Sequence, residues 1–208
     1  AVHLPLSKAA INETYELMLA PHNILNPKDG QTVAVPSQDM VIGLYYLTME
    51  EASSKIKVYQ NGDEAKKAYE LGHITLHQRI VVKSESVNKK VVTTVGKIIF
   101  SEIFPIDFDF VNDALFKEYS SYDELKSMIE STTYPEPFAK KGNVKEAINR
   151  IYDLYDKSVT VNVLDSMKSL GYKYATIAAV TIGMDDIIIP DEKATIIEET
   201  EKKVDYIN

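Results

Sequence analysis

The chain has 208 residues, no cysteine, a formal net charge of −8, 45% hydrophobic residues and 26% charged residues. The lack of cysteine excludes a disulfide framework, a thiolate zinc site and a cysteine nucleophile, and it is typical of an intracellular protein. The length suits one large or two small domains, no apolar run approaches a membrane span, and so acidic a chain is expected to meet nucleic acid only locally, inside a larger assembly.

The first six residues predict a short extended stretch, because Pro5 lacks an amide donor and disfavours helix at the residue before it. The chain starts at Ala1 without a signal-peptide pattern, so we expect it to begin inside a longer protein. Ser7 is placed to cap a helix that Pro21 ends. Asn-Pro and Asp-Gly turn signals then predict a structured loop, which leads into a strand over residues 32–35.

A buried helix is predicted by the sequence Pro-Ser-Gln-Asp-Met-Val-Ile-Gly-Leu-Tyr-Tyr-Leu-Thr at residues 36–48. Pro36 prevents the helix from extending backward, and Ser37 stands where an N-cap belongs. The polar opening turn, which contains Ser37, Gln38 and Asp39, would lie where the helix leaves the core, beside its partial positive charge. Such a turn suits an anionic ligand, but ordinary capping explains the same pattern.

A surface connection is predicted for residues 49–57, which are mostly polar. Residues 63–71 predict a helix that stops at Gly72. Residues 74–83 alternate apolar and polar side chains, and residues 91–100 form a second β-rich run. Together these two runs predict a hairpin or a pair of strands, joined by a wide loop because the linker has no glycine.

The segment over residues 107–119 is aromatic and acidic by turns, and it predicts an irregular packed structure. Two capping boxes, Ser121 with Glu124 and Asn143 with Glu146, predict the two helices that follow. Prolines in the segment between them separate the two helices.

A further helix is predicted over residues 160–170, with Gly171 as its end. A β-rich segment over residues 174–189 follows, and Pro190 closes it. Residues 191–208 predict one charged helix whose sparse apolar stripe is typical of a hairpin or coiled-coil arm. We therefore predict an α+β fold of mixed helices and short antiparallel strands, with one domain over residues 1–190 and the start of a truncated helical hairpin over residues 191–208.

No residue pattern predicts a self-sufficient active site. A turn or cap explains Asp185 and Asp186 better than a metal site, because neighbouring side chains on a strand point to opposite faces. The four histidines lack zinc-site spacing, and Ser37 lacks the G-x-S-x-G context of a hydrolase nucleophile. Thr-Thr-Val-Gly-Lys at residues 93–97 lacks the earlier glycine of a phosphate-binding loop, which favours a strand that ends in a bend.

The thirteen residues at 36–48 resemble a signature of the largest subunit of multisubunit RNA polymerase, in its bacterial beta-prime form. Other blocks resemble the same family in the same order, among them Val-His-Leu-Pro-Leu-Ser at 2–7, Asn-Ile-Leu at 23–25, Ala-Tyr-Glu-Leu-Gly at 68–72, Leu-His at 76–77, Thr-Thr-Val-Gly at 93–96, Leu-Gly-Tyr at 170–172 and Asp-Asp-Ile-Ile-Ile-Pro at 185–190. The resemblance is nearly end to end and is weakest over residues 106–159.

The resemblance implies the pore region of the polymerase, which forms the wall of the secondary channel and supports the active-site floor during DNA-templated RNA synthesis. It implies that the aspartates of the catalytic magnesium precede Ala1, so this fragment alone is inactive although the whole complex is a nucleotidyltransferase of the bacterial cytoplasm. The implied partners are other polymerase subunits, nucleotides, the RNA 3′ end, the DNA template and secondary-channel factors, but no membrane. Ser37 and Gln38 would lie near the RNA 3′ end, where the Gln38 amide would bond to ribose or base.

Two departures from the family pattern bear on this expectation. Ile177, Ala178 and Ala179 stand where Arg-Ser-Gly or Arg-Ala-Gly is usual, which removes a charge, and Lys97 stands where arginine is usual, which keeps the charge without the planar fork. The arm at 191–208 would lack its returning helix. The alternative function is an independent protein-interaction module that uses the C-terminal helix; a small hydrolytic or transfer enzyme would lack a site.

Overall fold

The computed structural model describes residues 1–84 and 89–207, and the chain divides into two compact units, Ala1–Ala178 and Ala179–Asn208. The predicted domain boundary near Pro190 stays a prediction. In chain order the elements are α1 Lys8–Glu13, the π-helical turn η1 Thr14–Met18, the 3-10 turn η2 Ala20–His22, α2 Asp39–Leu47, β1 Val58–Tyr59, α3 Gly62–Glu70, β2 Ile80–Lys83, β3 Lys90–Thr93, α4 Val95–Ser101, α5 Asp109–Leu115, β4 Lys117–Glu118, α6 Tyr122–Glu130, α7 Lys141–Leu154, α8 Lys157–Ala178, the 3-10 turn η3 Met184–Asp186 and α9 Lys193–Ile207.

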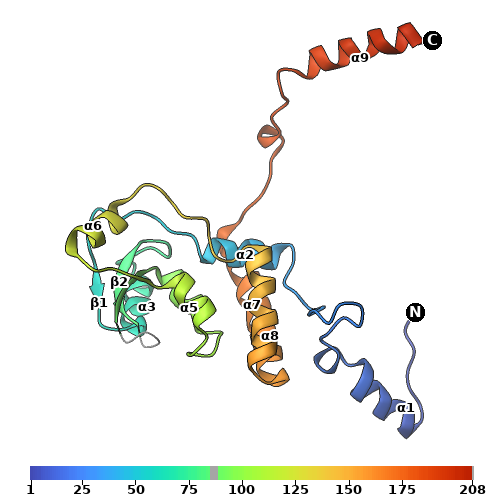
Figure 1. Ribbon diagram of the computed structural model, residues 1–208, viewed down its shortest axis with the longest axis horizontal. Helices are drawn as coiled ribbons and strands as arrows, with labels where there is room; N and C mark the ends of the chain where they lie inside the picture. Colours follow the sequence, from blue (N-terminus) through green and yellow to red (C-terminus); the bar gives the residue numbers. More distant parts are fainter. Residues whose placement is uncertain (85–88, 208) are drawn as a thin grey trace. The chain divides into compact units, whose positions relative to one another are not determined.

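The predicted α+β class is confirmed. The described strands form one sheet in the order β1-β2-β3-β4 (Figure 1). β2 and β3 pair antiparallel, as do β3 and β4, whereas β1 pairs with β2 in parallel. The predicted pair of strands is therefore present as β2 and β3, and most of its connecting loop, at residues 85–88, lies outside the described residues.

The N-terminal helix begins as predicted. Ser7 accepts a hydrogen bond from the Ala10 amide at 3.1 Å, and the helix winds on through η1 before Pro21. The strand predicted over residues 32–35 is wrong. Thr32 makes only an isolated β-bridge to Leu25. Its amide and its hydroxyl both donate hydrogen bonds to Oδ1 of Asn149 on α7, so these groups bond to a side chain and not to the backbone of a neighbouring strand.

Both predicted β-rich runs are shorter in the structure, since β2 begins only at Ile80 and β3 ends at Thr93. After Thr93 the chain turns into α4, because the Thr94 hydroxyl accepts the Lys97 amide at 3.2 Å and caps the helix. The prediction of strand over residues 95–100 is wrong for this reason. A local cap and the burial of Val95 and Ile98 outweigh the β preference of the sequence.

The irregular segment predicted over residues 107–119 is also wrong. Phe108, Val111 and Leu115 are buried at spacings of three and four residues, so they form the core-facing stripe of α5, and β4 follows directly. The acidic residues of this segment are exposed to solvent, and because they alternate with the buried residues in the sequence, the helical pattern is hard to recognise.

Of the two predicted capping boxes, the first is confirmed. The Ser121 hydroxyl accepts the Glu124 amide at 3.2 Å at the start of α6. The second is wrong, because α7 begins at Lys141 and Asn143 lies inside it, where its side-chain amide donates to the Phe138 carbonyl oxygen at 2.9 Å.

Gly171 does not end a helix, and the β-rich segment predicted over residues 174–189 is absent. α8 continues through Gly171 to Ala178, and the chain beyond it forms only η3 before α9. The predicted turn at the acidic pair is confirmed, since Asp186 accepts the Gly183 amide at 2.8 Å. The helix predicted for the C-terminus is confirmed as α9.

The main core of the first unit joins helices to one face of the sheet, and a second cluster, formed by Val81, Val92, Leu125 and Ile129, packs α6 against the other face. α7 and α8 run side by side, and the contact between α2 and α8 is the most extensive of any described helix pair (Figure 1). The largest side chains with almost no exposed surface are Phe100, Phe108, Leu44, Leu47, Ile80, Leu115, Ile129, Ile148, Ile151 and Met167. No described helix is both long enough and apolar enough to cross a membrane.

Candidate functional site

The Ser37–Gln38 turn precedes α2 and is exposed. α2 begins at Asp39 with Gln38 at the N-cap position and no side-chain capping bond, so the predicted N-cap role of Ser37 is wrong. The reason is a tight turn: the Ser37 carbonyl oxygen accepts the Met40 amide at 3.2 Å, with Gln38 at φ 49° and ψ −124°. These angles lie near those of the first central residue of a type II′ turn, a position that favours glycine.

The positive φ of Gln38 is a backbone conformation that costs a residue with a side chain about 1–3 kcal/mol, and it persists only where the surroundings impose it. Ser37, Gln38 and Asp39 are all exposed. Among the described residues, neither the Ser37 hydroxyl nor the Gln38 amide has a hydrogen-bond partner in the chain. The turn therefore presents an uncharged donor and acceptor to solvent on a strained backbone.

The rest of α2 is held by contacts between backbones. A Cβ built on Gly43 would lie 1.8 Å from the Gly171 carbonyl oxygen of α8, and one built on Gly96 of α4 would lie 2.0 Å from the Leu47 carbonyl oxygen. Only glycine allows such approaches. A Cβ built on Gly171 would in turn lie 2.7 Å from the Met40 Cα, so glycine is needed in the middle of α8, where α2 crosses.

A buried charge cluster lies just beyond the C-terminal end of α2. The Glu50 carboxylate pairs with both Arg79 and Lys97, and the exposed fractions of these side chains are 12%, 5% and 6%. The Arg79 Nε donates to Glu50 at 2.7 Å. Arg79 also donates to three backbone carbonyl oxygens at and after the end of α6, those of Met128, Ser131 and Thr133.

Burial and pairing act in opposite directions on the pKa of Glu50. Burial alone would raise it, but Lys97 and Arg79 together hold the pKa of Glu50 below its ordinary value. At Lys97 burial outweighs the attraction of Glu50, so the pKa of Lys97 is lowered. The sequence did not predict this cluster, because the pattern placed Glu50 in a surface connection. A single acidic residue after an apolar helix does not indicate which distant residues it pairs with.

His77 is buried beside the same end of α2, with its ring edge-on to Tyr46 at 4.4 Å between centroids. Its Nε2 is buried without a hydrogen-bond partner among the described residues, and its Nδ1 lies 3.8 Å from the Glu51 carboxylate. Burial lowers the pKa of His77 below its ordinary 6.5, although Glu51 and the Tyr46 backbone oppose that shift. The neutral ring is therefore the form that fits the fold.

This burial predicts a pH dependence of stability. Because the unfolded chain takes up the His77 proton first, stability that is present above pH 6.5 is lost as the pH falls below that value. We expect His77→Phe, which keeps the edge-on contact with Tyr46, to lose less stability than the wild type between about pH 7.5 and about pH 5.5 in urea unfolding. His73→Phe, at an exposed histidine, is the matched control. Equal pH dependence of the His77 variant and the wild type would contradict this assignment.

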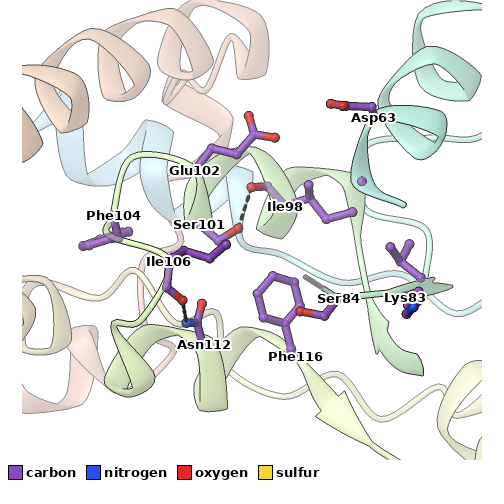
Figure 2. A pocket seen from close by; sticks show the side chains of 12 residues that line it. Asp63, Lys83, Ser84, Ile98, Ser101, Glu102, Phe104, Ile106, Asn112 and Phe116 are labelled. Atoms are coloured by element: carbon purple, nitrogen blue, oxygen red, sulfur yellow. Dashed lines mark hydrogen bonds between the residues drawn. The ribbon is translucent and has the colours of Figure 1, made fainter. Parts of the chain in front are cut away.

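A separate pocket of about 300 Å³ lies between α3, α4, α5 and the end of β2 (Figure 2). Its polar groups are largely engaged within the chain: Ser101 donates to the Ile98 carbonyl oxygen and Asn112 to that of Ile106. The acidic residues at its edge, Asp63 and Glu102, both pair with Lys66. The lining residues are Gly62, Asp63, Val82, Lys83, Ser84, Ile98, Ser101, Glu102, Phe104, Ile106, Asn112 and Phe116.

This pocket contains neither of the predicted site residues. Its two carboxylates, Asp63 and Glu102, form ion pairs with Lys66 and not with a nucleophile or a base. Across residues 1–84 and 89–207, no three histidine, aspartate or glutamate side chains are grouped so as to hold a metal ion. The Ser37–Gln38 turn stays the candidate site predicted from the sequence, and the groups that it offers are one amide and one hydroxyl.

Comparison with known proteins agrees with the resemblance in the sequence. The family model described as RNA polymerase Rpb1, domain 3, matches residues 23–187. The DNA-directed RNA polymerase subunit beta′ of Bacillus subtilis is 41% identical over 231 residues, that of Bacillus velezensis 40% over 231, and that of Halalkalibacterium halodurans 41% over 229. Each comparison covers 100% of this chain, which spans only 19% of the length of each of these relatives.

Proposed function

The chain belongs to the RNA polymerase Rpb1 domain 3 family, and from this we propose that it serves in the largest, beta-prime subunit of a bacterial DNA-directed RNA polymerase. In that subunit the chain forms part of the wall of the secondary channel and supports the active-site floor. The match over residues 23–187 and the identity of about 40% to beta-prime subunits along the whole chain support the proposal. The implied partners are the other subunits, the DNA template, nucleotides and the RNA 3′ end, in the bacterial cytoplasm.

The chemistry of nucleotidyl transfer lies outside this chain. The described residues do not fit the catalytic magnesium, because no group of three suitable side chains is placed for a metal ion. We assign that ion to aspartates elsewhere in the subunit, on the N-terminal side of Ala1. The role of this chain is to shape the passage and to place recognition groups beside the reacting ends.

One observation carries the assignment of the site, namely the exposed Gln38 amide on a strained turn in front of a rigidly packed helix. Such strain is found preferentially where it serves a function. A primary amide donates to and accepts from a ribose hydroxyl or a base edge, and it has no charge with which to retain a triphosphate. We assign Gln38 to the RNA 3′ end or the incoming nucleotide, with the Ser37 hydroxyl beside it.

The test is Gln38→Ala in the full-length subunit, assembled into the complete polymerase. Loss of one hydrogen bond worth about 1.4 kcal/mol in the transition state is expected to slow elongation or transcript cleavage about tenfold, while assembly stays normal. Gln60→Ala, at another exposed glutamine, is the matched control. Unchanged elongation and cleavage kinetics in the Gln38 variant would remove Gln38 from the site.

The C-terminal part of the chain is assigned to the channel rim. We place the boundary near Pro190 and take α9 as the first arm of a helical hairpin that receives secondary-channel factors. The exposed apolar residues of α9, Ile196, Ile197, Val204 and Ile207, support a packing partner for this helix. The contact that an arginine would make in the last turn of α8 is absent, since the chain has Ile177 there, followed by Ala178 and Ala179.

A further inference from the structure

Gly171 lies where α8 meets the first turn of α2. A Cβ at this position would approach Met40 at 2.7 Å from its Cα, 2.7 Å from its carbonyl oxygen and 3.0 Å from its Cβ. All three are atoms of the backbone or directly attached to it, so no side-chain rotation relieves the contact. Met40 is two residues after Gln38, which places this contact at the base of the Ser37–Gln38 turn.

The turn and the contact share their hydrogen bonds. The Met40 amide donates to the Ser37 carbonyl oxygen at 3.2 Å, and the amides of Val41 and Ile42 donate to the Gln38 carbonyl oxygen at 3.0 and 3.1 Å. A displacement of Met40 therefore changes the bonds that hold Gln38 at its positive φ. Since that conformation persists only where its surroundings impose it, the backbone of α8 beside Met40 is part of what imposes it.

We propose that Gly171 is a positioning residue, which sets the orientation of the Gln38 side chain through Met40 without touching the ligand itself. The inference rests on the proposed function of Gln38 and extends it to a second helix. The opposite end of α2 is held independently by Gly96 of α4 against Leu47. With that end held, pressure at Gly171 is expected to move the opening turn of α2 and not the whole helix.

Gly171→Ala is a suitable probe because its overlap forces a shift at Met40 but is smaller than the overlap at Gly43. The atoms nearest to the new Cβ would lie 2.7 Å away, compared with 1.8 Å for a Cβ on Gly43. Alanine is also more favourable than glycine in the interior of a helix such as α8. Val163→Ala is the matched control, since it lies on the same helix and is buried, but its truncation creates a cavity and applies no pressure to Met40.

The first experiment measures amide hydrogen exchange in the 208-residue chain. Gly171→Ala is expected to reduce protection at Met40 and Val41 about tenfold and at Thr48, at the other end of α2, about twofold or less. Val163→Ala should change the protection at both ends alike. If Gly171→Ala instead fails to fold alone, the same comparison is made in a Gly142→Ala background, where the added Cβ in α7 meets no atom within 4 Å and alanine favours the helix, and the same local pattern is expected. Equal changes at Met40 and Thr48 would overturn the proposal.

The second experiment uses the complete polymerase and compares Gly171→Ala in two backgrounds. With Gln38 present, Gly171→Ala should slow nucleotide addition severalfold; with Gln38→Ala already in place, it should add little, because the group that it positions is gone. An equal additional loss in both backgrounds would overturn the positioning role. If Gln38→Ala alone has no effect, the proposed function fails, whereas the exchange pattern still decides whether Gly171 controls the turn.

Discussion

Replacement of Gly43 by alanine is expected to lower the free energy of unfolding by about 3 kcal/mol or more, at the upper end of what overpacking costs. The new Cβ would lie 1.8 Å from the Gly171 carbonyl oxygen, 2.6 Å from the Ala175 nitrogen and 2.8 Å from the Gly171 carbonyl carbon. All three are backbone atoms of α8, so the overlap is relieved only if α2 and α8 separate. Because these helices share the most extensive helix–helix contact in the described residues, their separation exposes the centre of the core.

Thermal unfolding measures this effect, with an expected decrease in Tm of about 6–12 °C for a domain of this size. Gly142→Ala is the matched control, because a Cβ at Gly142 in α7 meets no atom within 4 Å and should be neutral or slightly stabilising. A Gly43→Ala variant with the Tm of the wild type would show that the two helices are not in backbone contact.

Replacement of Glu50 by glutamine is expected to cost about 3–5 kcal/mol, the usual penalty for leaving buried charge without its counter-ion. Arg79 and Lys97 would both keep their positive charge at exposed fractions of 5% and 6%. Glutamine preserves the shape of the side chain, so the loss reports on charge and not on packing. Glu118→Gln is the matched control, because its pair with Lys89 is solvent-exposed and worth about 0–1 kcal/mol.

The pH dependence of this effect provides its internal check. Because the folded protein holds the pKa of Glu50 below the ordinary 4.5, its contribution is present above pH 4.5 and is lost as the pH falls below that value. The wild type and Glu50→Gln should therefore converge in stability in acid. Combining Glu50→Gln with Lys97→Met, which removes one of the two unpaired charges, should recover part of the loss in urea unfolding. Additive losses in the double variant would contradict a shared buried cluster.

Several features of the fold were predicted correctly because their causes are local. Ser7 and Ser121 each cap a helix with a hydrogen bond to an amide three residues ahead, and Gly72 follows α3 at φ 73°, where glycine is favoured. The resemblance to the beta-prime subunit was also read correctly from the run at residues 36–48, since thirteen specified positions leave little room for coincidence.

The candidate site was predicted only in part. The polar, outward place of Gln38 at the opening of the helix follows from the sequence, but its N-cap position and its positive φ do not, because the conformation is imposed on the residue and runs against its own preference. The Glu50 cluster joins residues separated by 29 and 47 positions in the chain, and no local pattern connects them.

Sequence alone determined the family, the α+β class and those helix ends whose capping bonds lie within a few residues. Tertiary structure decided where the ambiguous segments belong. The sequence predicts that Gly171 ends a helix, but in the structure Gly171 is a point of backbone contact with α2. The sequence also predicts a strand over residues 95–100, but these residues form a helix that Thr94 caps. The physical reason is the same in both places: local preferences differ by about 1 kcal/mol or less, whereas burial of one large apolar side chain contributes about 1.5–3 kcal/mol.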